Sequence, residues 1–344
     1  MRVLMITSEW PAPGVNITAH FIKRQADFLS AAGVDVEVFP FKGAKNPFNY
    51  VKAWWQLQIK LRREQYDLIH AQFGQSGLLA LPKRLPMVVT FRGSDLLGTV
   101  SDRTGRHLRV SAIHQWLSRI VSRQAEQVIV VSEHMKAQLD PAVSAHVIPS
   151  GIDFSFFKPT DKKVARERLG LPLDEKLVLF VGRPTQARKR CYLAQEAIEI
   201  LNRSTPARLI VAWRIPHADI PMYMSACDAL VFTSMQEGSP NVVKEALACN
   251  LPVVSVPVGD VGERLDGIEG CELCADEQPE TIAAALGRVL RRNKRIAGRE
   301  SVLELDENNI TSKVLNIYKA VLARNEASVA TQAAKGNSLV ARSS

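Results

Sequence analysis

Two glutamates with seven residues between them, Glu237 and Glu245, are the side chains of this sequence best suited to chemistry. The residues between them predict a turn and then a helix. Ser239 suits the N-cap, and Pro240 suits the first helical position because the N–H that Pro lacks would be unpaired there. Free amides and the positive end of the helix dipole would bind a phosphate. The flanking carboxylates would accept hydrogen bonds from hydroxyl groups, so the stretch favours a sugar nucleotide as ligand.

Two glutamates taken alone are more often ordinary surface acids. The whole stretch 233–249, Thr-Ser-Met-Gln-Glu-Gly-Ser-Pro-Asn-Val-Val-Lys-Glu-Ala-Leu-Ala-Cys, nevertheless resembles the retaining GT-B glycosyltransferases of family 4, in which E-G-x-P-x4-E-A closes the donor site. The resemblance implies that Glu245 grips the ribose hydroxyls of the donor. It implies that Glu237 accepts hydroxyls of the transferred sugar. Further donor contacts fall on Gly238, Ser239, Pro240, Asn241 and Gly182.

A second stretch, 177–189, predicts a strand, a glycine turn and a cationic loop. A leaving nucleoside diphosphate carries several negative charges, and without a metal fixed cations must stabilise it. In the family that this chain resembles, the cations are an Arg directly after the Gly and a Lys six residues later. These are Arg183 and Lys189 here, which we assign to catalysis together with Glu237. The alternative is that the charges at 188–190 form only a solvated cluster.

The sequence predicts neither a metal nor a cofactor. Only Asp35 and Glu37 are spaced as an acid pair near the first strands, and they fit the pattern of a strand. The first strand is not followed by G-x-G-x-x-G, which lowers the odds of a dinucleotide. We therefore expect a nucleotide-diphosphate sugar as co-substrate and no metal.

The acceptor side is less well matched to the family. A loop ends in Thr18-Ala19, where relatives usually carry Gly so that the backbone approaches the donor phosphates and the acceptor. Arg92-Gly93-Ser94-Asp95 resembles the family's H-G-S-D, with Arg92 in place of the His. Arginine is always protonated and cannot copy a neutral imidazole, so Arg92 could bind an anionic sugar or an acceptor phosphate. For Asp95 the alternative is a cap of the following turn.

Alternating strand and helix patterns must position these residues. A β-α alternation predicts a parallel, doubly wound sheet, whose ligands bind beyond the carboxyl ends of the strands. The strands expected in the first half are 3–7, 34–39, 68–71, 87–91, 128–131 and 145–148. The helices expected between them lie near 20–32, 50–64, 76–83, 108–124 and 133–139.

The length of 344 residues favours two domains, because single cores rarely exceed about 250 to 300 residues. The fold class implied is α/β, a GT-B pair of Rossmann-like, doubly wound domains that face each other across a cleft. We expect an acceptor-side domain at 1–155, a nucleotide-sugar-binding domain at 156–310, a helix at 311–325 that returns to the first domain, and a disordered tail at 326–344.

Residues 41–64 combine aromatic side chains with six Lys/Arg and one Glu. This composition is typical of an interfacial helix on an anionic bilayer. It fits equally an amphipathic helix that packs on the sheet and exposes a basic face. The chain carries a net charge of +9, and +6 of it lies in residues 1–155, which favours an anionic partner there.

Other features predict a cytoplasmic protein that could lie at the inner face of the cell membrane. No stretch approaches the roughly 20 apolar residues of a membrane span. The N-terminus enters a strand pattern without a cleavable signal. The five cysteines are scattered, and Cys271 and Cys274 form a single C-x-x-C without a second pair, so buried thiols are favoured over a disulfide framework or zinc.

The resemblance implies a metal-independent hexosyltransferase that moves a sugar to a lipid-linked or saccharide acceptor in cell-surface polysaccharide synthesis. It does not involve nucleic acid. Two alternatives remain open at this point. A sugar-nucleotide epimerase shares the architecture but should need a pair of acid–base groups. A non-catalytic protein that binds sugar nucleotides or associates with the membrane is the other, because of Arg92 and Ala19.

Overall fold

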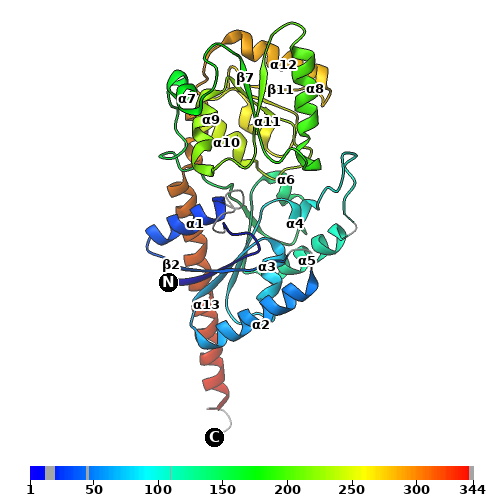
Figure 1. The fold of residues 1–344 in the computed structure, drawn as a ribbon. Coiled ribbons are helices and arrows are strands. Elements are labelled where there is room, and N and C mark those ends of the chain that lie inside the picture. Colours follow the sequence, from blue (N-terminus) through cyan, green and yellow to red (C-terminus); the bar gives the residue numbers. More distant parts are fainter. Residues whose placement is uncertain (12–19, 44–45, 109, 341–344) are drawn as a thin grey trace.

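Two parallel β-sheets, one in each half of the chain, form the frame of the molecule (Figure 1). The computed structural model describes residues 1–11, 20–43, 46–108 and 110–340, with side chains up to 327. The first sheet has the strand order β2-β1-β3-β4-β5-β6 and the second β11-β10-β9-β7-β8. Every strand pair is parallel, so the carboxyl ends of the strands lie at one edge of each sheet.

The strands and helices of the first half lie within residues 2–147. The strands are β1 (Arg2–Thr7), β2 (Asp35–Pro40), β3 (Leu68–Gln72), β4 (Met87–Phe91), β5 (Gln127–Val130) and β6 (Ala145–Val147). The helices are α1 (His20–Ala31), α2 (Pro47–Arg63), α3 (Gly74–Leu79), α4 (Ser94–Leu97), α5 (Ser111–Gln124) and α6 (Glu133–Lys136).

The second half repeats the alternation. Its strands are β7 (Leu177–Val181), β8 (Arg208–Ala212), β9 (Ala229–Phe232), β10 (Val253–Ser255) and β11 (Glu272–Leu273). Its α-helices are α7 (Lys162–Leu169), α8 (Cys191–Leu201), α9 (Ile220–Ala226), α10 (Asn241–Ala248), α11 (Val261–Leu265) and α12 (Pro279–Arg292). Three 3-10 helices, η1 (Ala187–Lys189), η2 (His217–Asp219) and η3 (Glu300–Leu305), precede the last helix, α13 (Glu307–Val340).

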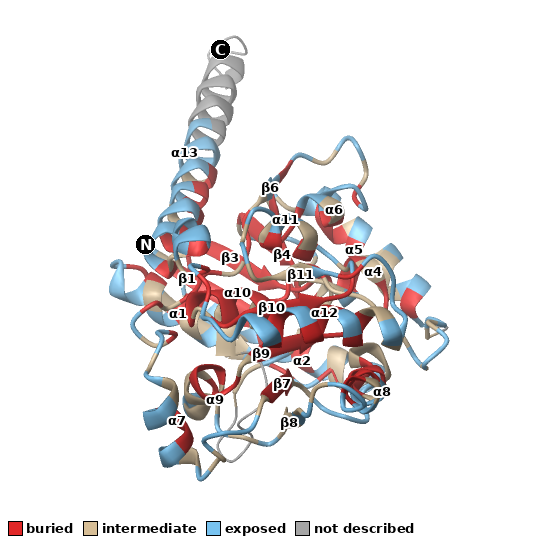
Figure 2. Ribbon diagram, turned by 90° about the horizontal axis from the view of Figure 1, so that it is seen from above, coloured by how far each residue is buried: buried red, intermediate tan, exposed pale blue. Residues whose placement is uncertain are grey.

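Both faces of each sheet are covered, because apolar residues occupy successive positions of the central strands. In β1, Val3 and Met5 belong to the core cluster that α1 and α13 cover, whereas Leu4 and Ile6 belong to the cluster beneath α2. Successive side chains of a strand point to opposite faces, so an unbroken apolar run requires helices on both sides. The buried residues accordingly form clusters on both faces of the sheets, behind helices whose outer faces are exposed (Figure 2).

The chain crosses between its two halves twice, at adjacent positions. Ile152 and Asp306 form a parallel bridge. The Ile152 N–H donates to the Leu305 carbonyl at 2.8 Å, and the Glu307 N–H donates to the Ile152 carbonyl at 2.9 Å. The break between the two sheets falls between Val147 and Leu177, a span that includes the boundary expected near 155.

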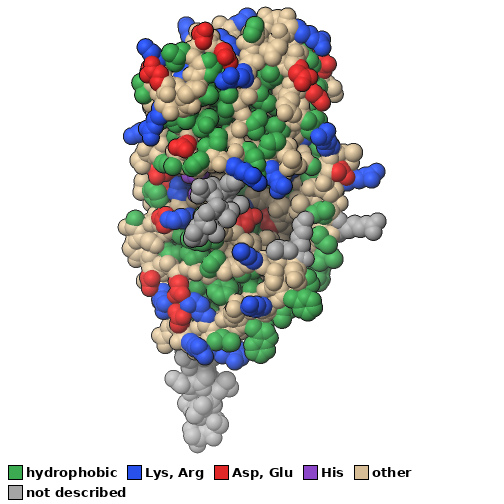
Figure 3. Space-filling view, viewed as in Figure 1, with side chains coloured by type: hydrophobic (Ala, Val, Ile, Leu, Met, Phe, Trp, Pro, Cys, Tyr) green, Lys and Arg blue, Asp and Glu red, His purple; other side chains and the backbone are tan. Residues whose placement is uncertain are grey.

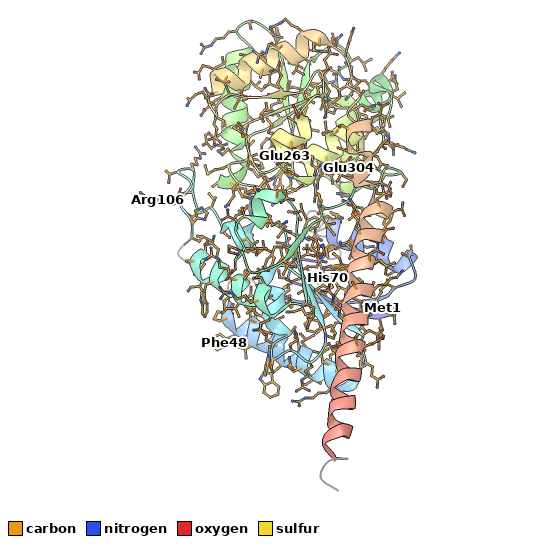
Figure 4. All side chains as sticks on the ribbon, turned by 180° about the vertical axis from the view of Figure 1, so that it is seen from behind. Met1, Phe48, His70, Arg106, Glu263 and Glu304 are labelled. Carbon is orange, nitrogen blue, oxygen red and sulfur yellow. The ribbon has the colours of Figure 1, made fainter. Side chains whose placement is uncertain are left out.

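Helix α13 returns along the first half, where it packs on α1 and reaches β3 (Figure 4). The Tyr318 hydroxyl lies 2.5 Å from His70 Nδ1, and Thr90 Oγ1 lies 2.7 Å from His70 Nε2. Both His70 and Tyr318 are fully buried, and burial lowers the pKa of His70 to about 3. A neutral imidazole therefore joins this helix to the central strands β3 and β4 of the first sheet.

The last helix is longer than the sequence indicated. It begins at Glu307 and continues to Val340, whereas we expected a helix at 311–325 followed by a disordered tail at 326–344. Residues 326–340 contain Glu, Gln and several Ala and lack proline, so their intrinsic propensity permits the helix to continue. Residues 341–344 lie outside the described part of the chain.

Candidate active site

A cleft of about 500 Å³ lies between the two halves, at the carboxyl ends of their strands. The loops after β1 and β4 and the start of α1 line one side of it, and the loops after β7 and β9 and the start of α10 line the other. A second cavity of about 640 Å³ adjoins it and shares Lys189, His20 and His217 with it. Figure 3 shows the hollow between the two halves, with Lys and Arg side chains near its rim.

The start of α10 faces the cleft, but it is built differently from our expectation. The N-cap is Pro240 and the first helical residue is Asn241, so the predicted N-cap at Ser239 is wrong by one position. The Ser239 hydroxyl donates instead to Asp260 Oδ2 at 2.8 Å. No hydrogen bond from a described side chain caps this helix, so its first amides remain available to an anion at the positive end of the dipole.

Gly238 is required by the close approach of the two halves. A β-carbon at this position would lie 2.6 Å from the Met135 sulfur, 2.8 Å from the Arg92 carbonyl oxygen and 2.9 Å from Val131 Cγ2. These distances exclude any larger residue without a shift of the backbone. Gly93 lies directly opposite, since its β-carbon would be 3.9 Å from the Gly238 nitrogen. The two glycines therefore form the point where the loops after β4 and β9 meet.

Glu237 lies between two cations at the floor of the cleft. Lys189 Nζ donates to Glu237 Oε1 at 2.7 Å, and Arg188 Nη1 lies 2.5 Å from Glu237 Oε2. Only 12% of the Glu237 side chain and 16% of the Lys189 side chain is exposed. Burial alone would raise the pKa of the carboxyl, but Lys189 and Arg188 outweigh it and hold the pKa at about 2. Glu237 is therefore ionised at neutral pH and can only accept hydrogen bonds.

Lys189 is held in place by its own segment, η1, which follows the glycine turn after β7. The Thr233 hydroxyl donates to the Lys189 carbonyl at 3.0 Å, and this contact ties η1 to the end of β9. Burial lowers the pKa of Lys189, and the attraction of Glu237 opposes that shift. The two predicted residues, 48 positions apart in the sequence, thus meet at neighbouring strand ends.

Glu245 lies farther along α10, inside the cleft, near a cation from the first half. Its Oε1 is 4.0 Å from Arg24 Nη1. Arg24 is held by Glu307, whose Oε2 accepts from Arg24 Nε at 2.9 Å, and by the Gly151 carbonyl, which accepts from Nη2 at 2.6 Å. Burial raises the pKa of Glu245, while Arg24, Lys244 and Lys189 act to lower it. The Glu245 carboxyl is thus positioned by α10 and lies near the Arg24 guanidinium on the other side of the cleft.

Arg183 and Gly182 line the second cavity rather than the main cleft. Arg183 is exposed, its Nε donates to Thr185 Oγ1 at 2.8 Å, and its guanidinium lies 5.9 Å from the centre of the Trp213 ring. Gly182 has φ +148°, and a β-carbon there would lie 3.6 Å from Lys189 Cγ. Arg183 and Glu245 therefore lie in adjoining cavities that share Lys189, not in one cavity.

The acceptor-side residues are largely occupied by contacts within the protein. Arg92 donates to Gln72 Oε1 at 2.9 Å, to Ser150 Oγ at 2.7 Å and to Gln25 Oε1 at 2.9 Å, and burial lowers its pKa to about 10. Its guanidinium also lies 4.9 Å from the centre of the Phe21 ring. Arg92 thus joins β3, α1 and the crossing at 150, although it also lines the cleft.

Asp95 serves as the turn cap that was the alternative for it. Its carboxylate accepts from the Gly93 N–H at 2.8 Å and from the Arg92 N–H at 3.2 Å, and its side chain is buried. Burial raises its pKa, and these backbone donors act to lower it. The remaining predicted residues on this side, Thr18 and Ala19, lie outside the described part of the chain.

Sequence reasoning missed several residues of the cleft. Arg188 received no role of its own from the sequence, yet it is a partner of Glu237. Gln236 donates through Nε2 to the Leu97 carbonyl in the opposite half at 2.7 Å, while its Oε1 is buried and has no hydrogen-bond partner among the described residues. The predicted residue Asn241 likewise has a buried, unpartnered Oδ1. Both side chains line the cleft and can accept hydrogen bonds from hydroxyl groups.

Two histidines meet across the cleft, another contact that the sequence did not predict. The rings of His20, on α1, and His217, on η2, are stacked with centroids 4.1 Å apart. The Phe156 ring also stacks on the His217 ring, with centroids 5.1 Å apart. Burial, with lesser effects of His20 and Arg24, lowers the pKa of His217 to about 4. His217 therefore packs as a neutral ring.

The described residues contain no group of three or more His, Cys, Asp or Glu side chains arranged to hold a metal ion. Nor does any helix in the described ranges have the length and apolar composition of a membrane span. The expectation that the reaction needs no metal stays a prediction.

Both halves of the chain match known families of glycosyltransferases. Residues 2–156 match the model of Glycosyltransferase Family 4, and residues 212–292 match that of Glycosyl transferases group 1. The "Putative teichuronic acid biosynthesis glycosyltransferase TuaC" of Bacillus subtilis is 31% identical over 257 residues, which cover 67% of this chain and 64% of that protein. A D-inositol 3-phosphate glycosyltransferase of Nocardiopsis dassonvillei is 26% identical over 309 residues, 76% of this chain and 72% of that one. The chain thus spans somewhat less than two thirds of the TuaC sequence.

Solved structures share the fold over nearly the whole chain. Sucrose-phosphate synthase from Thermosynechococcus elongatus superimposes with a TM-score of 0.78 at 21% identity, over 94% of this chain and 99% of that one. HepE of Anabaena, solved in complex with UDP, superimposes with a TM-score of 0.67 at 15% identity, over 93% of this chain and 100% of that one. These similarities confirm the predicted α/β architecture of two Rossmann-like domains. The matches to both halves place the chain in the family 4, group 1 glycosyltransferases, and its two facing doubly wound domains are the GT-B fold.

Proposed function

We propose that this protein is a retaining, metal-independent glycosyltransferase of the hexosyltransferase type. It moves a sugar from a nucleotide-diphosphate sugar to a lipid-linked or saccharide acceptor in cell-surface polysaccharide synthesis. The observation that carries the proposal is the cluster of Glu237, Lys189 and Arg188 beside the uncapped start of α10, in a cleft between two doubly wound domains. It brings together the cations, amides and carboxylates that a sugar nucleotide needs.

The donor would occupy both cavities. Its diphosphate lies beside Lys189, which the two cavities share, with Arg183 on one side and the first amides of α10 on the other. Glu245 holds the ribose hydroxyls as a hydrogen-bond acceptor, and Glu237 receives hydroxyls of the transferred sugar. The complexes of HepE with UDP and with UDP-glucose, in a protein of the same fold, support a donor of this class.

The chemistry follows from the charges. The bond between the anomeric carbon and the diphosphate oxygen breaks, and the acceptor oxygen bonds to that carbon on the same face of the sugar. Negative charge develops on the leaving diphosphate, and fixed cations stabilise it without reorganisation. The leaving phosphate oxygen takes the proton of the acceptor hydroxyl, so the protein need not supply a separate base. Glu237, ionised at neutral pH, orients the sugar and stabilises positive charge on its ring.

The pathway is supported by the relative named for teichuronic acid biosynthesis and by the basic first half of the chain. Both favour an acceptor with anionic or lipid-linked character at the cytoplasmic face of the membrane. Residues 41–64 supply the basic and aromatic surface for that location. Sugar-nucleotide epimerisation would require a pair of acid–base groups at the sugar, whereas Glu237, with a pKa of about 2, cannot serve as an acid at neutral pH.

The test is release of nucleoside diphosphate from UDP-, GDP- and ADP-sugars, with and without acceptor lipid. We expect release from one donor class and its acceleration by acceptor. Glu245→Ala and Lys189→Ala should each lower turnover at least a hundredfold, while circular dichroism stays unchanged. Glu196→Ala and Lys163→Ala, which change exposed residues of α8 and α7, are the matched controls. Normal turnover of both cleft variants would refute the site, and epimerised donor without release would refute transfer.

A further inference from the structure

The exposed side of α2 carries a stripe of large apolar residues. Phe48, Val51, Trp55 and Ile59 recur every three or four residues and therefore lie along one side of the helix. All four are exposed, Phe48 by 79% and Trp55 by 57%. Figure 4 shows Phe48 at the outer edge of the molecule. Single exposed apolar residues are ordinary, but a whole stripe of large ones marks an interaction surface.

This stripe does not result from a loosely attached helix. The opposite side of α2 buries Ala53, Leu57 and Gln58 against the first domain. The Trp54 indole donates to the Leu81 carbonyl at 2.7 Å, and Asn46 Oδ1 caps the helix start by accepting from the Phe48 N–H. The helix is thus packed on its inner side and presents its second apolar side outward. The packed inner side agrees with the interpretation of residues 41–64 as an amphipathic helix on the sheet, whereas contact with a bilayer stays a prediction.

A second helix of the same domain shows the same pattern, although its sequence had not suggested it. Ile113 and Trp116 of α5 are 57% and 60% exposed, and Val110 directly before the helix is 46% exposed. The inner side of α5 buries Ser118 and Val121. The spacing of three residues between Val110, Ile113 and Trp116 aligns them in one stripe.

The two stripes lie on one flank of the first domain. Helix α3 packs against both α2 and α5. Figure 1 places these three helices together, and Figure 3, from the same side, shows hydrophobic side chains among Lys and Arg in that region. We name the seven residues of the two stripes, with the neighbouring exposed basic residues of α2 and α5, the α2–α5 face. Its members are Phe48, Val51, Lys52, Trp55, Ile59, Arg62, Arg63, Val110, Ile113, Trp116 and Arg119.

The charge of the α2–α5 face has one sign. Neither α2 nor α5 contains an acidic residue. Lys52, Arg62, Arg63 and Arg119 are exposed, whereas Lys60 is engaged by Glu37 and Glu64 and does not contribute. Basic residues beside exposed tryptophan and phenylalanine complement a surface that is negatively charged at its outside and apolar just beneath.

We infer that the α2–α5 face docks the protein on an anionic lipid bilayer, with both helices in the plane of the interface. The inference deepens the proposed function, on which its biological sense rests, by adding α5 and by assigning the contact to outward apolar stripes. A second copy of the chain is a poorer occupant, because a two-fold dimer would bring the same cationic residues together. The loop from α4 to α5, whose Thr99 and Val100 line the cleft, links this face to the acceptor side.

The test measures sedimentation of the full chain with vesicles, without donor. Vesicles of phosphatidylcholine with 30% phosphatidylglycerol are compared with phosphatidylcholine alone. We expect at least tenfold stronger partition to the anionic vesicles and a marked loss in high salt. Trp55→Ser with Trp116→Ser should weaken partition at least tenfold, and Lys52→Glu with Arg119→Glu should remove the preference for anionic lipid. Leu173→Ser and Leu303→Ser, at exposed apolar residues of the other half, are the controls and should change nothing.

Each other outcome overturns the inference. Equal partition to both vesicle types removes the role of charge, and full partition of the tryptophan variant removes the role of the stripes. Dimerisation without lipid that the tryptophan variant abolishes would assign the face to a second copy instead. A variant with Trp116→Ser alone separates α5 from α2, since undiminished partition would limit the contact to α2. Donor binding, measured without vesicles, reports on the proposed function independently.

Discussion

Replacing Glu237 by Gln tests whether this carboxylate balances the cations of the cleft. The substitution keeps the size of the side chain and removes its charge. It leaves Lys189 Nζ and Arg188 Nη1, now 2.7 and 2.5 Å from carboxylate oxygens, without an anion. Two effects of opposite direction follow. The folded protein without ligand loses stability, whereas an anion that enters the cleft is attracted more strongly because no resident carboxylate competes for the cations.

The magnitude of the stability loss follows from burial. Breaking a fully buried ion pair costs about 3–5 kcal/mol, because one charge stays behind without a partner. Here 12% of Glu237 and 16% of Lys189 remain exposed, so solvent screens part of the effect. We expect a loss of about 2–3 kcal/mol in the free energy of unfolding and a fall of roughly 5–10 °C in Tm. For a nucleoside diphosphate we expect about tenfold tighter binding, equivalent to about 1.4 kcal/mol.

The assays are denaturant unfolding without ligand and calorimetric titration with the nucleoside diphosphate whose sugar is the donor. Turnover should fall although binding of the diphosphate improves, since Glu237 also orients the sugar. Glu269→Gln removes a carboxylate that is 85% exposed and paired with Arg292, and it serves as the control, with a change below about 0.5 kcal/mol. Unchanged stability together with weaker diphosphate binding would show that Glu237 does not balance these cations.

Three further predictions concern neighbouring groups. The pKa of Glu237, about 2, is below that of an unfolded glutamate, about 4.3. The ionised carboxylate therefore stabilises the folded state fully above pH 4.3, and this stabilisation is lost as the pH falls towards 2. The free energy of unfolding of Glu237→Gln should not show this loss in acid. Burial lowers the pKa of Lys244, whose Nζ donates to the Ser150 carbonyl, to about 7. Between about pH 7 and 10.4 the folded state therefore binds fewer protons than the unfolded state. In urea unfolding, the free energy of unfolding should rise by about 2 kcal/mol from pH 7 to 9. Lys244→Met should remove this rise. Gln236→Ala removes the hydrogen bond to the Leu97 carbonyl and the Oε1 atom that lines the cleft. We expect the free energy of unfolding to fall by about 1 kcal/mol. By calorimetry, we expect roughly tenfold weaker binding of the donor sugar nucleotide and unchanged binding of the free nucleoside diphosphate. Equal losses for both ligands would show that Oε1 does not contact the sugar.

The fold could be predicted from the sequence because its signals are local. Apolar runs such as 3–7 and 177–181 are short, uninterrupted and followed by turns, which is typical of strands buried on both faces. The alternation with helices then implies a parallel sheet whose strand ends gather the functional loops. The extent of α13 could not be predicted in this way, since a weakly amphipathic, alanine-rich segment is compatible with either helix or disorder.

The site could be predicted only where a residue lies in a segment that the fold itself brings to the carboxyl ends of the strands. Glu237, Glu245 and Lys189 lie at the cleft because their own segments take them there. The N-cap prediction at Ser239 was wrong by one position, and the Ser239 hydroxyl donates to Asp260, 21 residues later in the sequence. The internal role of Arg92 depends on three residues from different elements, and no spacing in the sequence reveals such a meeting.

The double crossing at Ile152 and Asp306 limits how the two domains can move. A single tether would leave them free to turn about any axis. Because the two crossing segments are hydrogen-bonded to each other, we expect them to resist twisting and sliding and to act as a hinge about a line through the pair. On that expectation, the distance between one pair of fluorescent labels, one on each domain, should report any opening of the cleft.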